Sequence, residues 1–148
     1  ANRCLIAVDS RAALRVLSRA ATAGGWAVRV GDDGDDLCRL LRSQMWGAVF
    51  VGEDLFEAGG GDQGLESPAA LAVALFREWE GAGTAGWRKR QRNIFLVRQP
   101  ALVTNGGRDN GVIPSGFDGT IATPIQRHEV ESLLEKARVR QFDREETM

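Results

Sequence analysis

Short apolar runs alternate along this chain with longer segments in which apolar residues recur every three or four positions. The short runs are bounded by polar residues or glycine and occupy residues 5–8, 26–30, 48–51, 94–97 and 119–122. Runs of this length are too short for a helix, and near-continuous apolar character is typical of strands buried on both faces of a sheet. The pattern therefore predicts five short strands.

The segments between and after these runs have the period of amphipathic helices. The apolar stripes of four predicted helices are formed by Leu14, Leu17 and Ala21, by Leu37, Leu40 and Leu41, by Leu71, Leu75 and Trp79, and by Val130, Leu133, Leu134 and Ala137. Residues typical of helix ends flank these stripes. They comprise a stop at Gly24 and Gly25, an N-cap at Asp35 or Asp36, and helix starts at Ser67 with Pro68 and at Pro124.

Glycine and asparagine mark the loops. Residues 57–64 include four of the 18 glycines and predict a flexible loop. Residues 100–114 lack a helical period, and their turn-forming residues are Asn105, Gly106, Gly107, Asn110 and Gly111. We therefore expect the helix between the fourth and fifth strands to be short or missing.

Strands that alternate with helices predict an α/β fold, an open parallel sheet covered on both faces. Right-handed crossovers leave few topologies, of which the flavodoxin-like strand order 2-1-3-4-5 fits best. We expect one such domain over residues 1–140 and a charged C-terminal linker over residues 141–148.

Composition narrows the class of protein. The 148 residues are 43% hydrophobic and 26% charged, as in soluble globular domains. A net charge of −1 gives no overall field for nucleic acid. Cys4 and Cys38 make neither a disulfide scaffold nor a zinc site, which favours a reducing intracellular setting. His128 reads as a solvated surface residue. The chain begins at Ala1 without a signal-peptide pattern, and we expect it to be part of a longer protein.

Polar residues follow the predicted strands at one edge of the sheet. In open α/β folds, functional sites lie at the carboxyl ends of the strands. The residues expected along that rim are Asp9, Ser10, Gly52, Glu53, Arg98 and Thr123.

Three motifs at these strands resemble the receiver domains of two-component response regulators and hybrid histidine kinases. They are Leu-Ile-Ala-Val-Asp-Ser at 5–10, Trp-Gly-Ala-Val-Phe-Val at 46–51 and Gly-Phe-Asp-Gly-Thr-Ile-Ala-Thr-Pro-Ile at 116–125. The last is the most specific, because receivers usually carry Gly-x-Asp-x-x-x-x-Lys-Pro there. The resemblance also implies a cis peptide bond between Thr123 and Pro124.

The resemblance implies a set of rim side chains that this sequence mostly lacks. Receivers hold Mg²⁺ with an acidic pair after the first strand and with the phosphate-accepting aspartate after the third. A threonine or serine and a lysine complete the site. Here Asp9 matches the first acid, while the other positions hold Ser10, Gly52, Arg98 and Thr123. We therefore expect a non-phosphorylatable pseudo-receiver that is not an enzyme and binds no metal or cofactor. An atypical acceptor at Glu53 or Asp54 is the alternative.

A basic segment precedes the fourth strand and consists of Trp87, Arg88, Lys89, Arg90 and Arg92. It reads as a solvated loop or as a protein-docking patch, since Trp and Arg are enriched among interface anchors. Its few cations would give only weak, salt-dependent affinity for nucleic acid. The glycine-rich segments match no phosphate-binding motif.

Among receivers, the chain most resembles the degenerate receiver-like domain of plant cytokinin receptor histidine kinases. Val8-Asp9-Ser10-Arg11 is similar to that group's Val-Asp-Gly-Arg. The resemblance implies a phosphorelay setting in which the partners are a kinase or a true receiver domain, of the same or a partner chain. It implies a cytosolic domain that is not itself inserted in a membrane, and it leaves open whether the parent protein is membrane-anchored.

Overall fold

A computed structural model describes residues 3–32, 34–52, 68–82, 91–98, 116–122 and 125–146. Its elements are β1 (Arg3–Ala7), α1 (Arg11–Ala23), β2 (Ala27–Val30), α2 (Gly34–Ser43), β3 (Ala48–Gly52), α3 (Pro68–Gly81), β4 (Ile94–Arg98), β5 (Gly119–Ala122) and α4 (Arg127–Glu146). The strands form one parallel sheet in the order β2-β1-β3-β4-β5. The predicted α/β class and flavodoxin-like strand order are confirmed.

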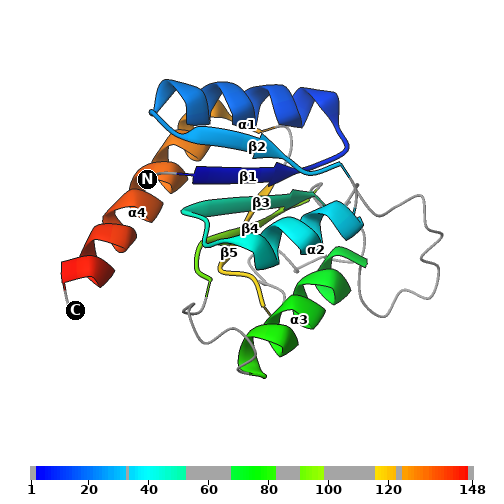
Figure 1. Cartoon of the computed structure of the whole chain (residues 1–148). Helices are drawn as coiled ribbons and strands as arrows, with labels where there is room; N and C mark the ends of the chain where they lie inside the picture. The colour runs from blue at the N-terminus through cyan, green and yellow to red at the C-terminus, as the bar shows by residue number, and fades with distance from the viewer. Residues whose placement is uncertain are drawn as a thin grey trace, which may run out of the picture.

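The sheet lies between two layers of helices (Figure 1), and it separates two hydrophobic cores. Alternate strand residues, such as Ile6 and Phe50, pack with α1 and α4 on one face. Their neighbours, such as Leu5 and Val49, pack with α2 and α3 on the other. Because successive side chains of a strand point to opposite faces, a strand covered by helices on both sides must be apolar throughout. This explains the uninterrupted apolar runs of β1, β3 and β4, whereas the edge strands β2 and β5 are mostly exposed or partly buried.

The first two helices follow from their local sequences. In α1 the expected residues Leu17 and Ala21 are buried, and in α2 Leu37, Leu40 and Leu41 are buried. The predicted N-cap at Asp35 or Asp36 is wrong, because α2 already begins at Gly34. Asp36 still acts at this helix end, since its Oδ2 accepts a hydrogen bond of 3.0 Å from the Asp32 backbone N–H.

The third helix turns a different face to the core from the one predicted. Val73 and Phe76 are fully buried, whereas Leu75 of the predicted stripe is 50% exposed and Trp79 is only partly buried. The helix is apolar on several sides, so its hydrophobic period does not single out one face. Packing against α2 and the sheet selects the face instead.

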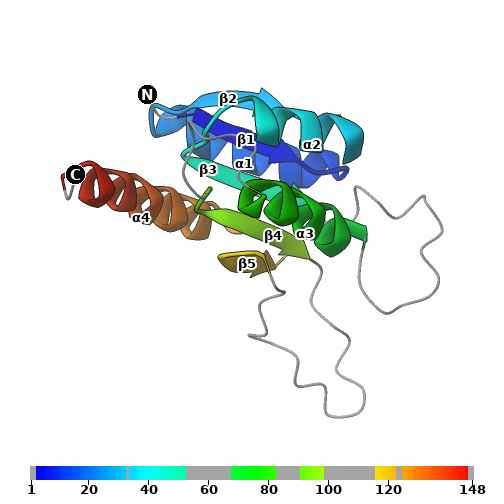
Figure 2. The ribbon, with the colours of Figure 1, turned by 60° about the horizontal axis from the view of Figure 1, so that its bottom comes forward.

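The last helix begins later and runs further than expected. It starts at Arg127, three residues beyond the predicted start at Pro124, and continues to Glu146. Residues 141–146 of the expected linker are therefore helical, and these last turns run past the amino ends of the strands (Figure 2). Val130, Leu134 and Ala137 are buried as predicted.

Two expectations about the fold concern residues that the structure does not describe. Residues 99–115, where the usual fourth helix was expected to be short or missing, lie outside the described ranges. The predicted glycine-rich loop at 57–64 also lies outside them. Among the described helices, none combines the length and apolar character that a membrane span requires.

Candidate functional site

The strand register brings the expected rim positions to one edge of the sheet. Ala7 pairs with Val51, Gly52 with Val97, and Arg98 with Ala122. Asp9 and Ser10 follow β1 at the same carboxyl-terminal edge. The described members of the predicted rim therefore lie at the same edge of the sheet, as the sequence predicted.

Ser10 serves the backbone of α1. Its side-chain oxygen accepts a hydrogen bond of 3.2 Å from the Ala13 N–H, and its carbonyl accepts the first helical bond from Leu14. Its extended backbone, with φ −71° and ψ 123°, is that of an N-cap. The position at which the resemblance expects a metal-binding carboxylate therefore carries a neutral hydroxyl that is committed to helix capping.

The end of β3 has no reactive side chain. Gly52 is buried and is the last residue of the strand, next to Val97 of β4. Arg98 follows Val97 at the end of β4 and is partly buried. Asp9 is the one carboxylate among the described rim residues, and it and Arg98 both have further noncovalent partners.

The described rim residues offer few ligands to a divalent cation. Mg²⁺ prefers several hard oxygen ligands, while Asp9 supplies one carboxylate and Gly52 supplies no side-chain oxygen. Arg98, at the end of β4, has a side chain that only donates hydrogen bonds and supplies no oxygen ligand. Within the described ranges, His, Cys, Asp and Glu form no group of three that could hold a metal.

Several predicted site residues lie outside the described residues. They are the alternative acceptors Glu53 and Asp54, the degenerate position Thr123 with Pro124 and its expected cis bond, and Trp87, Arg88, Lys89 and Arg90 of the basic segment. Of that segment the structure describes Arg92, whose side chain is exposed.

A buried polar cluster at the opposite end of the sheet was missed in the sequence. Gln91 and Asn93, which precede β4, are 0% and 2% exposed. The backbone N–H of Gln91 donates to Glu80 at 2.7 Å, and the Glu80 carboxylate also accepts from Arg77 at 2.8 Å. Neither an apolar period nor a charge pattern marks the two amides, so a single sequence offers no signal for them.

One part of this cluster was visible in the sequence as the Gly-x-Asp motif. Asp118 accepts a hydrogen bond of 2.9 Å from the Ile94 N–H and returns one of 2.7 Å to the Ile94 carbonyl. Gly116 has φ +96°, a conformation that favours glycine, and its carbonyl accepts two bonds from Arg77. The motif therefore holds the starts of β4 and β5 together.

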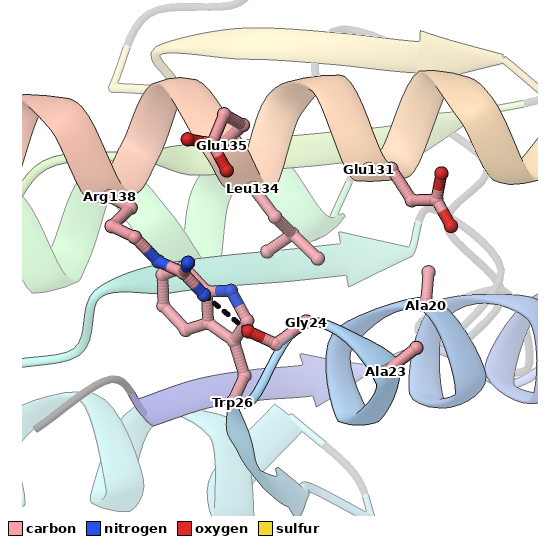
Figure 3. Close-up of a pocket in the computed structure, with 8 residues that line it drawn as sticks. All are labelled: Ala20, Ala23, Gly24, Trp26, Glu131, Leu134, Glu135 and Arg138. Atoms are coloured by element: carbon pink, nitrogen blue, oxygen red, sulfur yellow. Dashed lines mark hydrogen bonds between the residues drawn. The ribbon is translucent and has the colours of Figure 1, made fainter.

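A cavity of about 240 Å³ lies between α1 and α4 (Figure 3). Its walls include Trp26, Leu134 and the carboxylate-bearing Glu131 and Glu135. The guanidinium of Arg138 occupies one end, where it donates to the Gly24 carbonyl and lies 5.8 Å from the centre of the Trp26 ring. The cavity adjoins the amino end of β2, whereas the rim lies at the carboxyl ends of the strands, so the two are separate features.

Comparison with known proteins agrees with this architecture. No protein-family model and no curated protein matches the chain. A CheY-like response regulator receiver domain from Methylobacillus flagellatus superposes with a TM-score of 0.62 at 17% identity, covering 92% of this chain and 98% of that one. A two-component response regulator from Clostridium difficile gives a TM-score of 0.68 at 10% identity, with coverages of 95% and 98%.

A third similar structure is a complex. The chain matches the co-crystal structure of the Saccharomyces cerevisiae histidine phosphotransfer protein Ypd1 and the receiver domain of the response regulator Ssk1. The TM-score is 0.67 at 14% identity, with 95% of this chain and 90% of that chain covered. At these identities the comparisons establish the receiver fold.

Proposed function

We propose that this chain is a pseudo-receiver, a domain with the receiver fold that binds other signalling proteins without accepting a phosphoryl group. The observation that carries the proposal is Gly52 at the end of β3, the position of the acceptor aspartate in the resemblance. A glycine offers no oxygen to phosphorylate. The acceptor position is not the only one that differs from receivers, because the neighbouring rim positions also lack the residues that the resemblance expects.

The other rim side chains support the same function. Ser10 is used as an N-cap, and Arg98 stands at the end of β4 where the resemblance expects a threonine or serine. Phosphoryl transfer depends on positioning and charge neutralisation by a metal and by cations placed around the phosphate. A chain with glycine at the acceptor position and serine at one of the metal-binding positions therefore retains the fold for another purpose.

Protein binding is the purpose that the fold supports best. One of the similar structures contains a histidine phosphotransfer protein with a receiver domain, so a receiver fold offers surfaces for such partners. We propose a kinase or true receiver domain as the partner in a cytosolic phosphorelay. The Val8-Asp9-Ser10-Arg11 motif supports a place in a hybrid histidine kinase of the cytokinin-receptor type.

A phosphorylation assay tests the proposal. The chain is incubated with Mg²⁺ and acetyl phosphate, and separately with Mg²⁺ and beryllofluoride, and is followed by intact-mass spectrometry and amide NMR. We expect no phosphoryl adduct and no change at the rim. An adduct that the Glu53→Gln or Asp54→Asn variant removes would establish the alternative acceptor and overturn the proposal.

A restored variant provides the matched positive control. Ser10→Asp, Gly52→Asp, Arg98→Thr and Thr123→Lys together return the acidic pair, the acceptor, the threonine and the lysine that the resemblance expects. We expect this variant to respond to beryllofluoride with Mg²⁺ at the rim. The comparison would show that the missing side chains, and not the backbone, prevent the reaction.

A further inference from the structure

The outer surface of α1 carries a row of arginines. Arg11, Arg15 and Arg19 are all exposed and follow one another at a spacing of four residues. Residues four apart lie on the same side of a helix, and each step advances by about 6 Å along its axis. We call these three residues the arginine row. In Figure 1, α1 lies on the outside of the sheet, with no described helix beyond it.

The charges of the arginine row are not neutralised within the described part of the chain. The described ion pairs join other residues, namely Arg39 to Asp36, Arg77 to Glu80 and Asp118, and Arg127 to Glu131. The sequence of α1 contains no acidic residue. The three guanidinium groups thus face solvent, in contrast to Arg77 and Arg138, which bind carbonyls of the protein.

The row does not serve the stability of its helix. Arg11 occupies the first turn, where the helix dipole favours negative charge. Like charges four residues apart repel each other and destabilise a helix slightly. The helix is instead held by its Ser10 cap and by buried Leu17, Ala20 and Ala21. A well-anchored helix that presents unneutralised charges is suited to binding an anionic partner.

The neighbouring surface limits the shape of that partner. The helix α4 packs beside α1, and its exposed side chains include Glu129, Glu131 and Glu135. Glu131 and Glu135 line the cavity between α4 and α1, so a broad anionic surface such as a membrane laid over α1 would also meet carboxylates and be repelled. The net charge of −1 gives no wider attraction for a polyanion. A narrow acidic element that lies along α1 would contact the arginines without covering the carboxylates of α4, and it needs no attraction from the rest of the molecule.

We propose that the arginine row is the docking site for an acidic helix of a protein partner. Carboxylates at a spacing of four residues on the partner helix match the repeat of the arginines, so that each guanidinium meets one carboxylate. The inference rests on the proposed function as a protein-binding domain and specifies its surface and the chemistry of its partner.

The test uses a fluorescent, alanine-based helical peptide with three glutamates at a spacing of four, and a matched peptide with glutamines. Anisotropy titrations use the whole 148-residue chain. We expect binding of the glutamate peptide to be at least about tenfold tighter than that of the glutamine peptide, and to weaken as salt screens the charges. The variant Arg11→Gln, Arg15→Gln, Arg19→Gln should lose this preference.

A second triple variant, Arg29→Gln, Arg39→Gln, Lys136→Gln, removes the same number of exposed positive charges elsewhere and should bind as the unchanged chain does. Equal loss in both variants would overturn the proposal, because the attraction would then follow from net charge alone. Tighter binding of phosphatidylserine vesicles or single-stranded oligonucleotide through the same arginines would also overturn it. Failure of peptide binding leaves the phosphorylation assay unaffected, so the two proposals can fail separately.

Discussion

The side-chain amide of Gln91 forms two hydrogen bonds with the backbone of Trp46. Its Oε1 accepts from the Trp46 N–H at 2.9 Å, and its Nε2 donates to the Trp46 carbonyl at 2.6 Å. Gln91 is fully buried and Trp46 is 6% exposed. The side-chain amide thus pairs with the Trp46 backbone as a neighbouring strand would. It links the segment that precedes β3 to the segment that precedes β4.

Replacing Gln91 with leucine should destabilise the domain by about 2–4 kcal/mol, because two buried backbone groups of Trp46 lose their partners. Urea unfolding followed by tryptophan fluorescence measures the change. Gln126→Leu is the control, since that residue is exposed, and should shift the free energy of unfolding by less than about 0.5 kcal/mol. Equal effects in the two variants would contradict this role of Gln91.

The Arg77→Lys substitution should cost about 1–3 kcal/mol of stability. The guanidinium of Arg77 donates to the Gly116 carbonyl at 3.0 and 2.9 Å, to the Gln91 carbonyl at 2.8 Å and to Glu80 at 2.8 Å. A lysine keeps the charge but cannot reach these groups together. The control is Arg39→Lys, the same substitution at an exposed arginine. If Arg77→Lys lowers the free energy of unfolding no more than this control does, the hydrogen bonds of Arg77 do not stabilise the domain as predicted.

Ser10→Ala should destabilise the chain by about 1 kcal/mol through loss of the N-cap of α1. Ser10→Asp should retain most of the stability, because aspartate is as good an N-cap as serine. Denaturant midpoints of the two variants measure this difference. A midpoint for Ser10→Asp as low as that for Ser10→Ala would mean that a carboxylate is not tolerated at this rim position.

The two thiols should differ in reactivity. Burial raises the pKa of the Cys4 thiol from 9.0 to about 12, whereas Cys38 is only partly buried. At pH 8 a disulfide reagent should therefore modify Cys38 much faster than Cys4 in the folded chain, and both thiols rapidly after denaturation. Mass mapping of the labelled peptides identifies each site. Equal rates in the folded chain would contradict the burial of Cys4.

The raised pKa of Cys4 makes the free energy of unfolding depend on pH in the alkaline range. The folded state holds the pKa of Cys4 above its ordinary value of 9.0, so the unfolded chain loses this proton first. The Cys4 contribution is therefore fully present below pH 9 and declines as the pH rises toward 12. Between pH 8 and pH 10, the urea midpoint of Cys4→Ala should fall less than that of the unchanged chain. An identical fall would show that other groups account for the whole change.

The sequence by itself determined the strands, the burial of β1, β3 and β4, and most helix faces. Strands between two layers must be apolar on both sides, so their runs are visible without any tertiary information. In α2, the buried stripe of Leu37, Leu40 and Leu41 stands out because the other side of the helix is charged. The rim positions could be assigned because each follows directly from the end of a strand.

Only the tertiary structure decided the features that depend on neighbours distant in sequence. The core-facing side of α3 could not be predicted, since that helix is apolar on more than one side and its contacts with α2 and the sheet leave Leu75 exposed. The Trp46 backbone that the Gln91 amide binds is 45 residues away along the chain, and a buried amide has no local pattern that reveals which backbone groups it will satisfy.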